Sequence, residues 1–233
     1  MTLSPHPERH RQINDGWARA AIFGASDGLV TNVSLILGFA GAQPGHSVVR
    51  LAGLAGLVAG AFSMASGEYL SMTAQRELFE REIDVERRAI AQYPSAERDE
   101  LEAIFVSRSI EPTLAAQLAD GLMRDPELAL RTHTREELGI DPNAVGNPVR
   151  AAMFSLVAFA LGALIPLLPW LVTTSGNQVW WSVGVSAVAS FALGGTIGWF
   201  SDRGVWRAGF RQLAITALAA TVTWCVGRAV GTK

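Results

Sequence analysis

A stripe of side chains with metal-binding chemistry lies in the second apolar segment of the sequence. Met64, Glu68 and Met72 are spaced four residues apart, so in a helix they project from one face. A thioether beside a carboxylate suits a transition metal better than Mg²⁺ or Ca²⁺, which prefer shells of oxygen ligands. The stripe therefore predicts a transition-metal site, although packing against lipid or protein is the commoner role of a lone methionine in a membrane helix.

A single acidic residue, Asp27, interrupts the first apolar segment, with Thr31 on the same helical face. Charged groups inside membrane spans are costly and rare, so each one suggests a function. A hydrogen bond that helps two helices pack is the alternative role for Asp27. The sequence predicts an ion pathway formed by four residues: Asp27, Thr31, Met64 and Glu68.

Closely spaced glutamates recur in the polar middle of the chain. Carboxylates three or four residues apart on a helix project from one face and can share a cation. The pairs are Glu82 with Glu86, Glu97 with Glu100, and the adjacent Glu136 and Glu137. Glutamate pairs are also common on solvated helices, and neighbouring arginines can neutralise them, so the spacing alone leaves both interpretations open.

The charge of the chain is segregated by position. Of 233 residues, 49% are apolar and 17% charged, with a formal charge of −2. Residues 76–146 hold 16 of the 21 acidic residues and 9 of the 19 basic ones, which makes this stretch −7 and the remainder +5. An acidic block set into an apolar chain predicts a polar insert in a membrane protein.

Five apolar segments are long enough, or nearly so, to span a membrane as helices. The first covers about residues 18–42, and the second runs from Arg50 to Glu68. Residues 151–201 carry no charge, so we expect two spans there with a turn at residues 173–177. A fifth span is expected at about residues 212–226.

The predicted fold is therefore an all-α membrane protein with five transmembrane helices and a helical insert between spans two and three. We expect the second helix to continue into the insert as far as Tyr93-Pro94, because a proline disfavours helix at the residue before it. The expected divisions are residues 1–73 with spans one and two, 74–146 as a cytoplasmic acidic metal-binding domain, and 147–233 with spans three to five. Apolar stripes on two of the insert's helices should pack against each other. One stripe comprises Leu114, Leu118 and Leu122.

Basic residues near the span ends predict the orientation, because they favour the cytoplasmic side. They precede span one and separate spans four and five, whereas the loops after spans one and three have no Lys or Arg. These basic residues are Arg9, Arg11, Arg19, Arg203, Arg207 and Arg211. We expect a multi-pass protein of the cell (inner) membrane with its N-terminus and insert in the cytoplasm and its C-terminus outside. Tryptophans near the span ends, among them Trp170, Trp180 and Trp199, are typical of an interfacial aromatic belt.

Several function classes are disfavoured. One cysteine, Cys225, excludes a disulfide within the chain. The sequence has no phosphate-binding glycine loop, no CxxC and no HExxH, so we expect no enzyme. Nucleic acid is an unsuitable partner for an acidic polar domain.

The motifs resemble those of the vacuolar iron transporter family, of which the chain looks like a bacterial member. The resemblance rests on residues 23–32 (FGASDGLVTN) and 59–69 (AGAFSMASGEY), and extends through 135–139 (REELG), 147–150 (NPVR) and 164–169 (LIPLLP).

The resemblance implies a five-span homodimer in the lipid bilayer that exchanges cytosolic Fe²⁺ and similar ions for protons. It implies that Asp27 and Met64 line the pathway. Metal ligands in the insert are implied at Glu86, Glu97, Glu100 and Glu137. The chain departs from the family pattern at three positions: Ala89 replaces a glutamate, His133 stands where some members have methionine, and Ser26 replaces a common asparagine.

From these features we expect a transporter that exports Fe²⁺ by proton antiport, with Mn²⁺, Co²⁺ and Zn²⁺ as further candidate substrates. The metal is its substrate, and no permanently bound cofactor is expected. The metal ligands expected in the insert are Glu82, Glu86, Glu97, Glu100, Glu137 and His133, whose imidazole suits iron. The alternative is a membrane-anchored metal-binding buffer or sensor that does not transport.

Overall fold

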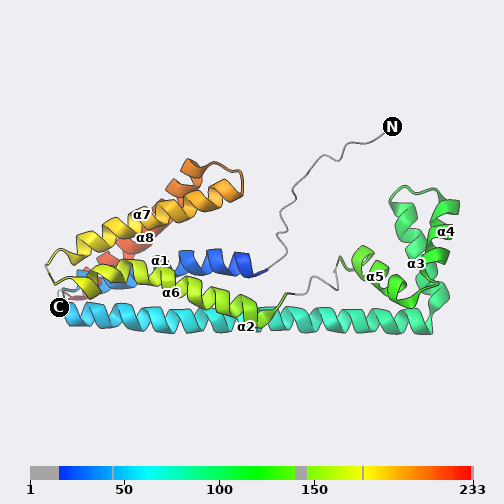
Figure 1. Ribbon diagram of the computed structural model, residues 1–233, viewed down its shortest axis with the longest axis horizontal. Helices are drawn as coiled ribbons and strands as arrows, with labels where there is room; N and C mark the ends of the chain where they lie inside the picture. The colour runs from blue at the N-terminus through cyan, green and yellow to red at the C-terminus, as the bar shows by residue number, and fades with distance from the viewer. Residues whose placement is uncertain (1–15, 44, 140–145, 175, 232–233) are drawn as a thin grey trace. The chain divides into compact units, whose positions relative to one another are not determined.

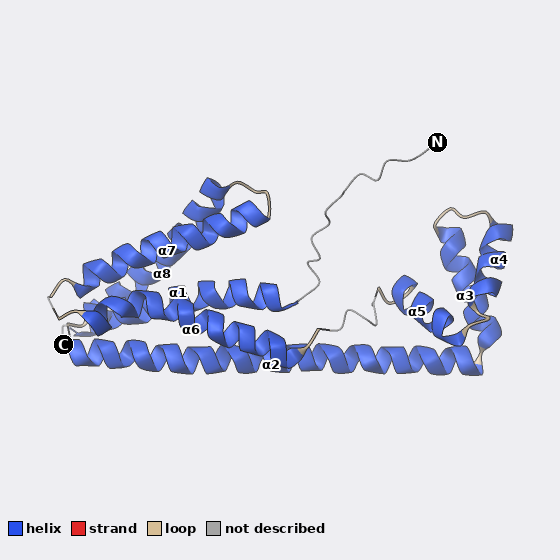
Figure 2. Ribbon diagram, viewed as in Figure 1, coloured by secondary structure: helices blue, strands red, loops and turns tan. Residues whose placement is uncertain are grey.

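The computed structural model describes residues 16–43, 45–139, 146–174 and 176–231, and these residues form eight α-helices (Figures 1 and 2). In chain order the helices are α1 (Gly16–Gly41), α2 (His46–Gln92), α3 (Pro94–Ser107), α4 (Pro112–Leu122), α5 (Pro126–Glu136), α6 (Pro148–Val172), α7 (Gln178–Phe200) and α8 (Val205–Gly231). The prediction of an all-α chain is confirmed. Arg9, Arg11 and part of the predicted turn at 173–177 lie outside the described residues.

Five of these helices, α1, α2, α6, α7 and α8, are long and apolar enough to cross a membrane, as predicted. Helix α2 is apolar only in its first half, and charged residues follow in close succession from Arg76. Its membrane-spanning part therefore lies before Arg76. The helix ends at Gln92, directly before Tyr93-Pro94, as expected from the proline. Helix α8 is longer than predicted at both ends, because Arg207, Arg211 and Arg228 lie within it.

The chain divides into two compact units, and α2 contributes to both. One unit comprises Met1–Leu70 with Pro148–Lys233, and the other comprises Ser71–Asn147. The second unit contains α3, α4 and α5. Compactness alone does not establish independent domains, so the boundaries predicted at residues 74 and 146 stay predictions.

Close backbone contact between α1 and α6 organises the first unit. Gly24 and Gly28 of α1 lie against Ser155 and Phe159 of α6, and Gly162 lies against α1 in return. A Cβ atom at Gly28 would overlap the carbonyl oxygen of Phe159. Small residues are the usual means by which membrane helices approach each other closely, and here they hold the helix that carries Asp27.

Helix α2 packs on this pair through apolar side chains. Ala61 joins a buried cluster with Phe159 and Ala163 of α6, and Val49 joins another with Ile36 and Leu167. Trp170 is only 6% exposed and its ring lies 5.3 Å from that of His46. Trp170 therefore does not face the membrane surface, in contrast to its predicted place in the aromatic belt, whereas Trp180 and Trp199 are exposed.

The second unit buries a different face of α4 from the one predicted. Ala115 and Ala119 are fully buried, whereas Leu114 and Leu118 are 50% and 40% exposed. Beside this alanine face, Arg98 of α3 pairs with Asp120 of α4 at 2.7 Å. Asp125 is the N-cap of α5, and its carboxylate accepts hydrogen bonds from the backbone N–H groups of Glu127 and Leu128.

The α1–α6 contact leads to a stability prediction. We expect Gly28→Ala to destabilise the protein by about 1–3 kcal/mol, because the added methyl group forces two helix backbones apart. Gly184→Ala in α7 is the matched control, since a Cβ there meets no atom within 4 Å. Thermal unfolding in detergent should show a lower melting temperature for Gly28→Ala alone. Equal melting temperatures for the two variants would contradict this packing.

Candidate metal centre

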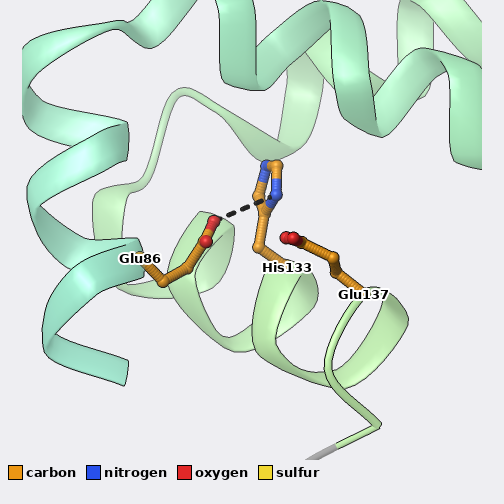
Figure 3. Close-up of side chains that lie close together, drawn as sticks. All are labelled: Glu86, His133 and Glu137. Atoms are coloured by element: carbon orange, nitrogen blue, oxygen red, sulfur yellow. Dashed lines mark ion pairs between the residues drawn. The ribbon is translucent and has the colours of Figure 1, made fainter. Parts of the chain in front are cut away.

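Three potential metal ligands come together in the second unit (Figure 3). One donor atom from each of Glu86, His133 and Glu137 lies within 4.8 Å of the others. Glu86 comes from the charged half of α2, whereas His133 lies near the end of α5 and Glu137 directly follows that helix. A carboxylate–imidazole–carboxylate set is a suitable ligand group for Fe²⁺, Mn²⁺, Co²⁺ or Zn²⁺.

Apolar packing sets the register that brings these ligands together. Ile90 of α2 packs with Ala129 and Leu130 of α5 in a buried cluster. Glu86 lies one helical turn before Ile90, and His133 lies one turn after Ala129. The same two helix faces therefore bury the apolar cluster and, next to it, the polar group.

Glu86 and His133 are buried and their ligand atoms are poorly satisfied, whereas Glu137 is exposed. His133 is 0% exposed and Glu86 is 7% exposed. The His133 Nδ1 atom lies 3.2 Å from Oε1 of Glu86 and 3.8 Å from Oε2 of Glu97. Among the described residues, however, neither ring nitrogen has a partner with hydrogen-bond geometry, and nor does that Glu86 oxygen. Leaving buried polar atoms without partners is costly, and a cation bound between them would supply the missing interaction.

Burial and mutual repulsion change the acidity of these groups. Burial above all, together with the charges of Glu137, Glu97 and Glu100, raises the pKa of Glu86 to about 7. The pKa of Glu137 is also raised, first by burial and then by Glu100 and Glu97. Burial lowers the pKa of His133, against the opposing effect of the same two glutamates. At neutral pH the imidazole is therefore in its neutral, metal-binding form, whereas Glu86 retains part of its proton.

The six predicted insert ligands do not all lie at the cluster of Glu86, His133 and Glu137. Glu97 approaches the cluster of Glu86, His133 and Glu137, and Glu100 adds its charge. Glu82, one turn earlier on α2, is not among the residues whose ligand atoms come together. Glu136, the other half of the last glutamate pair, forms an ion pair with Arg108. The metal-binding role of all six residues stays a prediction.

The predicted pathway residues lie on α1 and the apolar half of α2. Asp27 is half-buried and accepts a hydrogen bond of 3.3 Å from the hydroxyl of Thr31. Within the described part of the chain, no cationic side chain pairs with Asp27. Met64 is partly buried and packs on the cluster of Ala61, Phe159 and Ala163. These contacts fit the alternative role for Met64, which is packing against other helices.

Glu68 has a partner that the sequence did not suggest. The guanidinium of Arg19, at the start of α1, lies 3.5 Å from Glu68 Oε1. The Glu68 side chain is 16% exposed, and this oxygen makes no hydrogen bond within the described residues. The sequence indicates only an effect of Arg19 on orientation. Arg19 and Glu68 are 49 positions apart, and they become neighbours only because α1 packs beside α2.

Comparison with known proteins gives matches along nearly the whole chain. The sequence model of the VIT family matches residues 18–228. Vacuolar iron transporter 1 of Oryza sativa subsp. japonica is 33% identical over 229 residues, covering 98% of this chain and 90% of the relative. Vacuolar iron transporter 1 of Arabidopsis thaliana is 31% identical, with coverage of 98% and 91%. The vacuolar iron transporter of Acanthamoeba castellanii is 32% identical, with coverage of 94% and 82%.

The raised pKa of Glu86 gives a pH prediction. A metal ion must displace the Glu86 proton below pH 7, so we expect metal affinity to fall about tenfold for each pH unit below that value. Above pH 8 this group should cause no further change. Calorimetric titration of the purified full-length protein with Mn²⁺ between pH 5.5 and 8.5 tests this. A flat profile would contradict it.

The unequal placement of the glutamates gives a second prediction. At pH 7.5 we expect Glu86→Gln to weaken Mn²⁺ binding at least about tenfold, because an amide is a poorer ligand than a carboxylate. Glu82→Gln, one turn away on the same helix, should change it less than about twofold. The metal-free Glu86→Gln protein should melt no lower than the unmodified protein, since glutamine resembles the neutral acid that burial favours. Equal losses of affinity in both variants would show that the cluster is not the binding site.

Proposed function

Because the chain belongs to the VIT family, we propose that it exports cytosolic Fe²⁺ across a membrane in exchange for protons. The family consists of transporters and not enzymes, and the five apolar helices fit a multi-pass membrane protein. Iron is then the substrate, and the cluster of Glu86, His133 and Glu137 binds it before it is transported. Mn²⁺, Co²⁺ and Zn²⁺ share its ligand preferences, and we include them as candidate substrates.

The observation that carries the exchange mechanism is a half-buried carboxylate in a membrane helix with no cationic partner among the described residues. A charged group inside a membrane span is costly unless an ion of opposite charge accompanies it. The group can be neutralised by a proton or by a metal ion, and one excludes the other. Alternating occupancy by the two ions couples metal export to proton entry.

Met64 and Glu68 extend this pathway along α2. The thioether of Met64 favours transition metals over Mg²⁺ and Ca²⁺. Glu68 pairs with Arg19 at 3.5 Å without a hydrogen bond, an arrangement that an arriving divalent ion can displace. Arg19 then neutralises Glu68 when the pathway holds no metal.

The insert would collect ions for this pathway on the cytoplasmic side. Its buried imidazole is neutral at neutral pH, which leaves the nitrogen lone pair available to a metal. The same cluster also favours the alternative function, a membrane-anchored buffer or sensor. The two functions differ in one measurable property, because only the transporter moves metal across a membrane.

For orientation and assembly, we propose the arrangement that the sequence predicts. We propose a location in the cell membrane with the N-terminus and insert in the cytoplasm, supported by three arginines in or beside the turn between α7 and α8: Arg203, Arg207 and Arg211. We also propose a homodimer. Large apolar side chains are exposed along the first half of α2, and a second copy would cover them together with lipid. They include Leu51, Val58, Phe62 and Leu70.

The transport role of Asp27 is tested with purified protein in liposomes whose interior is acidic. We expect the unmodified protein to accumulate Fe²⁺ and Asp27→Asn to transport no faster than empty liposomes, because an amide cannot exchange a proton for a metal. Asp202→Asn is the matched control. Asp202 is exposed at a φ of 55°, and asparagine tolerates this conformation.

The outcome separates the proposals. Accumulation of Fe²⁺ by Asp27→Asn at the normal rate would remove Asp27 from the mechanism. An unmodified protein that binds Fe²⁺ but fails to transport it with or without the pH gradient would favour the buffer or sensor.

A further inference from the structure

A chain of hydrogen bonds crosses three membrane helices and ends beside Asp27. The side-chain amide of Gln212 on α8 donates to the hydroxyl of Ser26 on α1 at 2.6 Å. One turn further along α8, the hydroxyl of Thr216 donates to the backbone carbonyl of Gln212 at 3.0 Å. Thr216 also accepts a hydrogen bond of 3.0 Å from Ser190 on α7. Helix α8 is thus hydrogen-bonded to α7 and to α1 by residues one helical turn apart.

Gln212 can reach α1 because α7 and α8 approach each other at a glycine. A Cβ atom at Gly194 of α7 would lie 2.6 Å from Cβ of Gln212 and 2.5 Å from the carbonyl oxygen of Ala208. A larger residue at position 194 would push α8 away. Ser190 and Thr216, which lie near this contact, are 0% and 4% exposed, so their hydrogen bond belongs to the buried packing between α7 and α8.

The position of Ser26 on α1 determines what the Gln212 bond can do. Successive residues of a helix point about 100° apart, so Ser26 points away from the flank formed by Gly24 and Gly28. That glycine flank lies against α6, and Ser26 is bonded to α8 on the opposite flank. Asp27 lies between the two flanks, at roughly a right angle to the line that joins them. The two contacts together fix the rotation of α1 about its axis.

We propose that Gln212 is a positioning residue for Asp27: through Ser26 it holds the rotational setting of α1 in which the carboxylate faces the ion pathway. This inference rests on the transport role proposed above for Asp27. It assigns a function to α8, a helix that contributes no residue to the predicted pathway. It also accounts for Ser26, which still offers a hydrogen-bond acceptor where the family commonly has asparagine.

Interhelical hydrogen bonds also serve simply to hold membrane helices together, and the bond between Ser190 and Thr216 is of that kind. It joins α7 to α8 and does not touch α1. Ser190→Ala is therefore a matched control: it removes a buried bond of similar length one turn away without releasing Ser26. A role in positioning and a role in stability then predict different results.

The experiment measures the concentration of Fe²⁺ that half-saturates transport into acidic liposomes, together with the melting temperature of each variant. We expect Gln212→Leu and Ser26→Ala each to raise the half-saturating concentration about tenfold, near the most that one such bond supports. The double variant should be no worse than either single variant, because both remove the same bond. Ser26→Thr, which keeps the hydroxyl, should stay near the unmodified value, and so should Ser190→Ala.

An unchanged half-saturating concentration in Ser26→Ala and Gln212→Leu would overturn the inference, and so would an equal rise in Ser190→Ala. Additive effects in the double variant would also overturn it. If Asp27→Asn is inactive in the same assay, such a result removes only the positioning role. If Asp27→Asn transports normally, the proposed pathway itself fails.

Discussion

The rest of the structure depends on one constraint. Two acid groups, Glu86 and Asp27, are wholly or partly removed from water, and among the described residues neither has a stable cationic partner. A carboxylate removed from water prefers its proton until a cation arrives. Glu86 shows this outside the membrane, where burial and three neighbouring glutamates raise its pKa to about 7. Asp27 is half-buried in an apolar helix and has one neutral hydrogen-bond donor, Thr31. Glu86 is therefore suited to exchange a proton for a metal ion near neutral pH, and under the proposed function Asp27 would exchange the two ions where they cross the membrane.

Such groups must be held in place by the surrounding helices, because an unpaired buried carboxylate lowers its free energy by moving toward water. In the first unit, the contacts of Gly24 and Gly28 with α6 and the bond from Gln212 to Ser26 hold α1 on both sides of Asp27. In the second unit, the packing of Ile90 on α5 holds Glu86 and His133 together. In both cases the contacts that fix the helices are formed by residues one turn or less from the reactive group.

Sequence reasoning predicted the elements well because their signals are local. Runs of apolar residues mark five spans, and Tyr93-Pro94 marks the end of α2. It was weaker for relations between elements. Nothing in the spacing separates Glu82 from Glu86, although only Glu86 joins the cluster. The partners Arg19–Glu68 and Gln212–Ser26 lie 49 and 186 positions apart, so they become visible only when the helices pack. The prediction that the leucine stripe of α4 is buried was wrong, because the small side chains of Ala115 and Ala119 form the buried face instead.

His133 changes the balance of charge in the cluster. A carboxylate in its place would add a fourth repulsive partner for Glu86, after Glu137, Glu97 and Glu100. A neutral imidazole offers a lone pair without that repulsion. On α2, the helix that carries Glu86, Ala89 stands where another carboxylate could have been. The metal-free cluster is then less strained, and the binding of a cation relieves less repulsion. Under the proposed function, a site of this kind would hold its ion less tightly and release it more readily to the pathway.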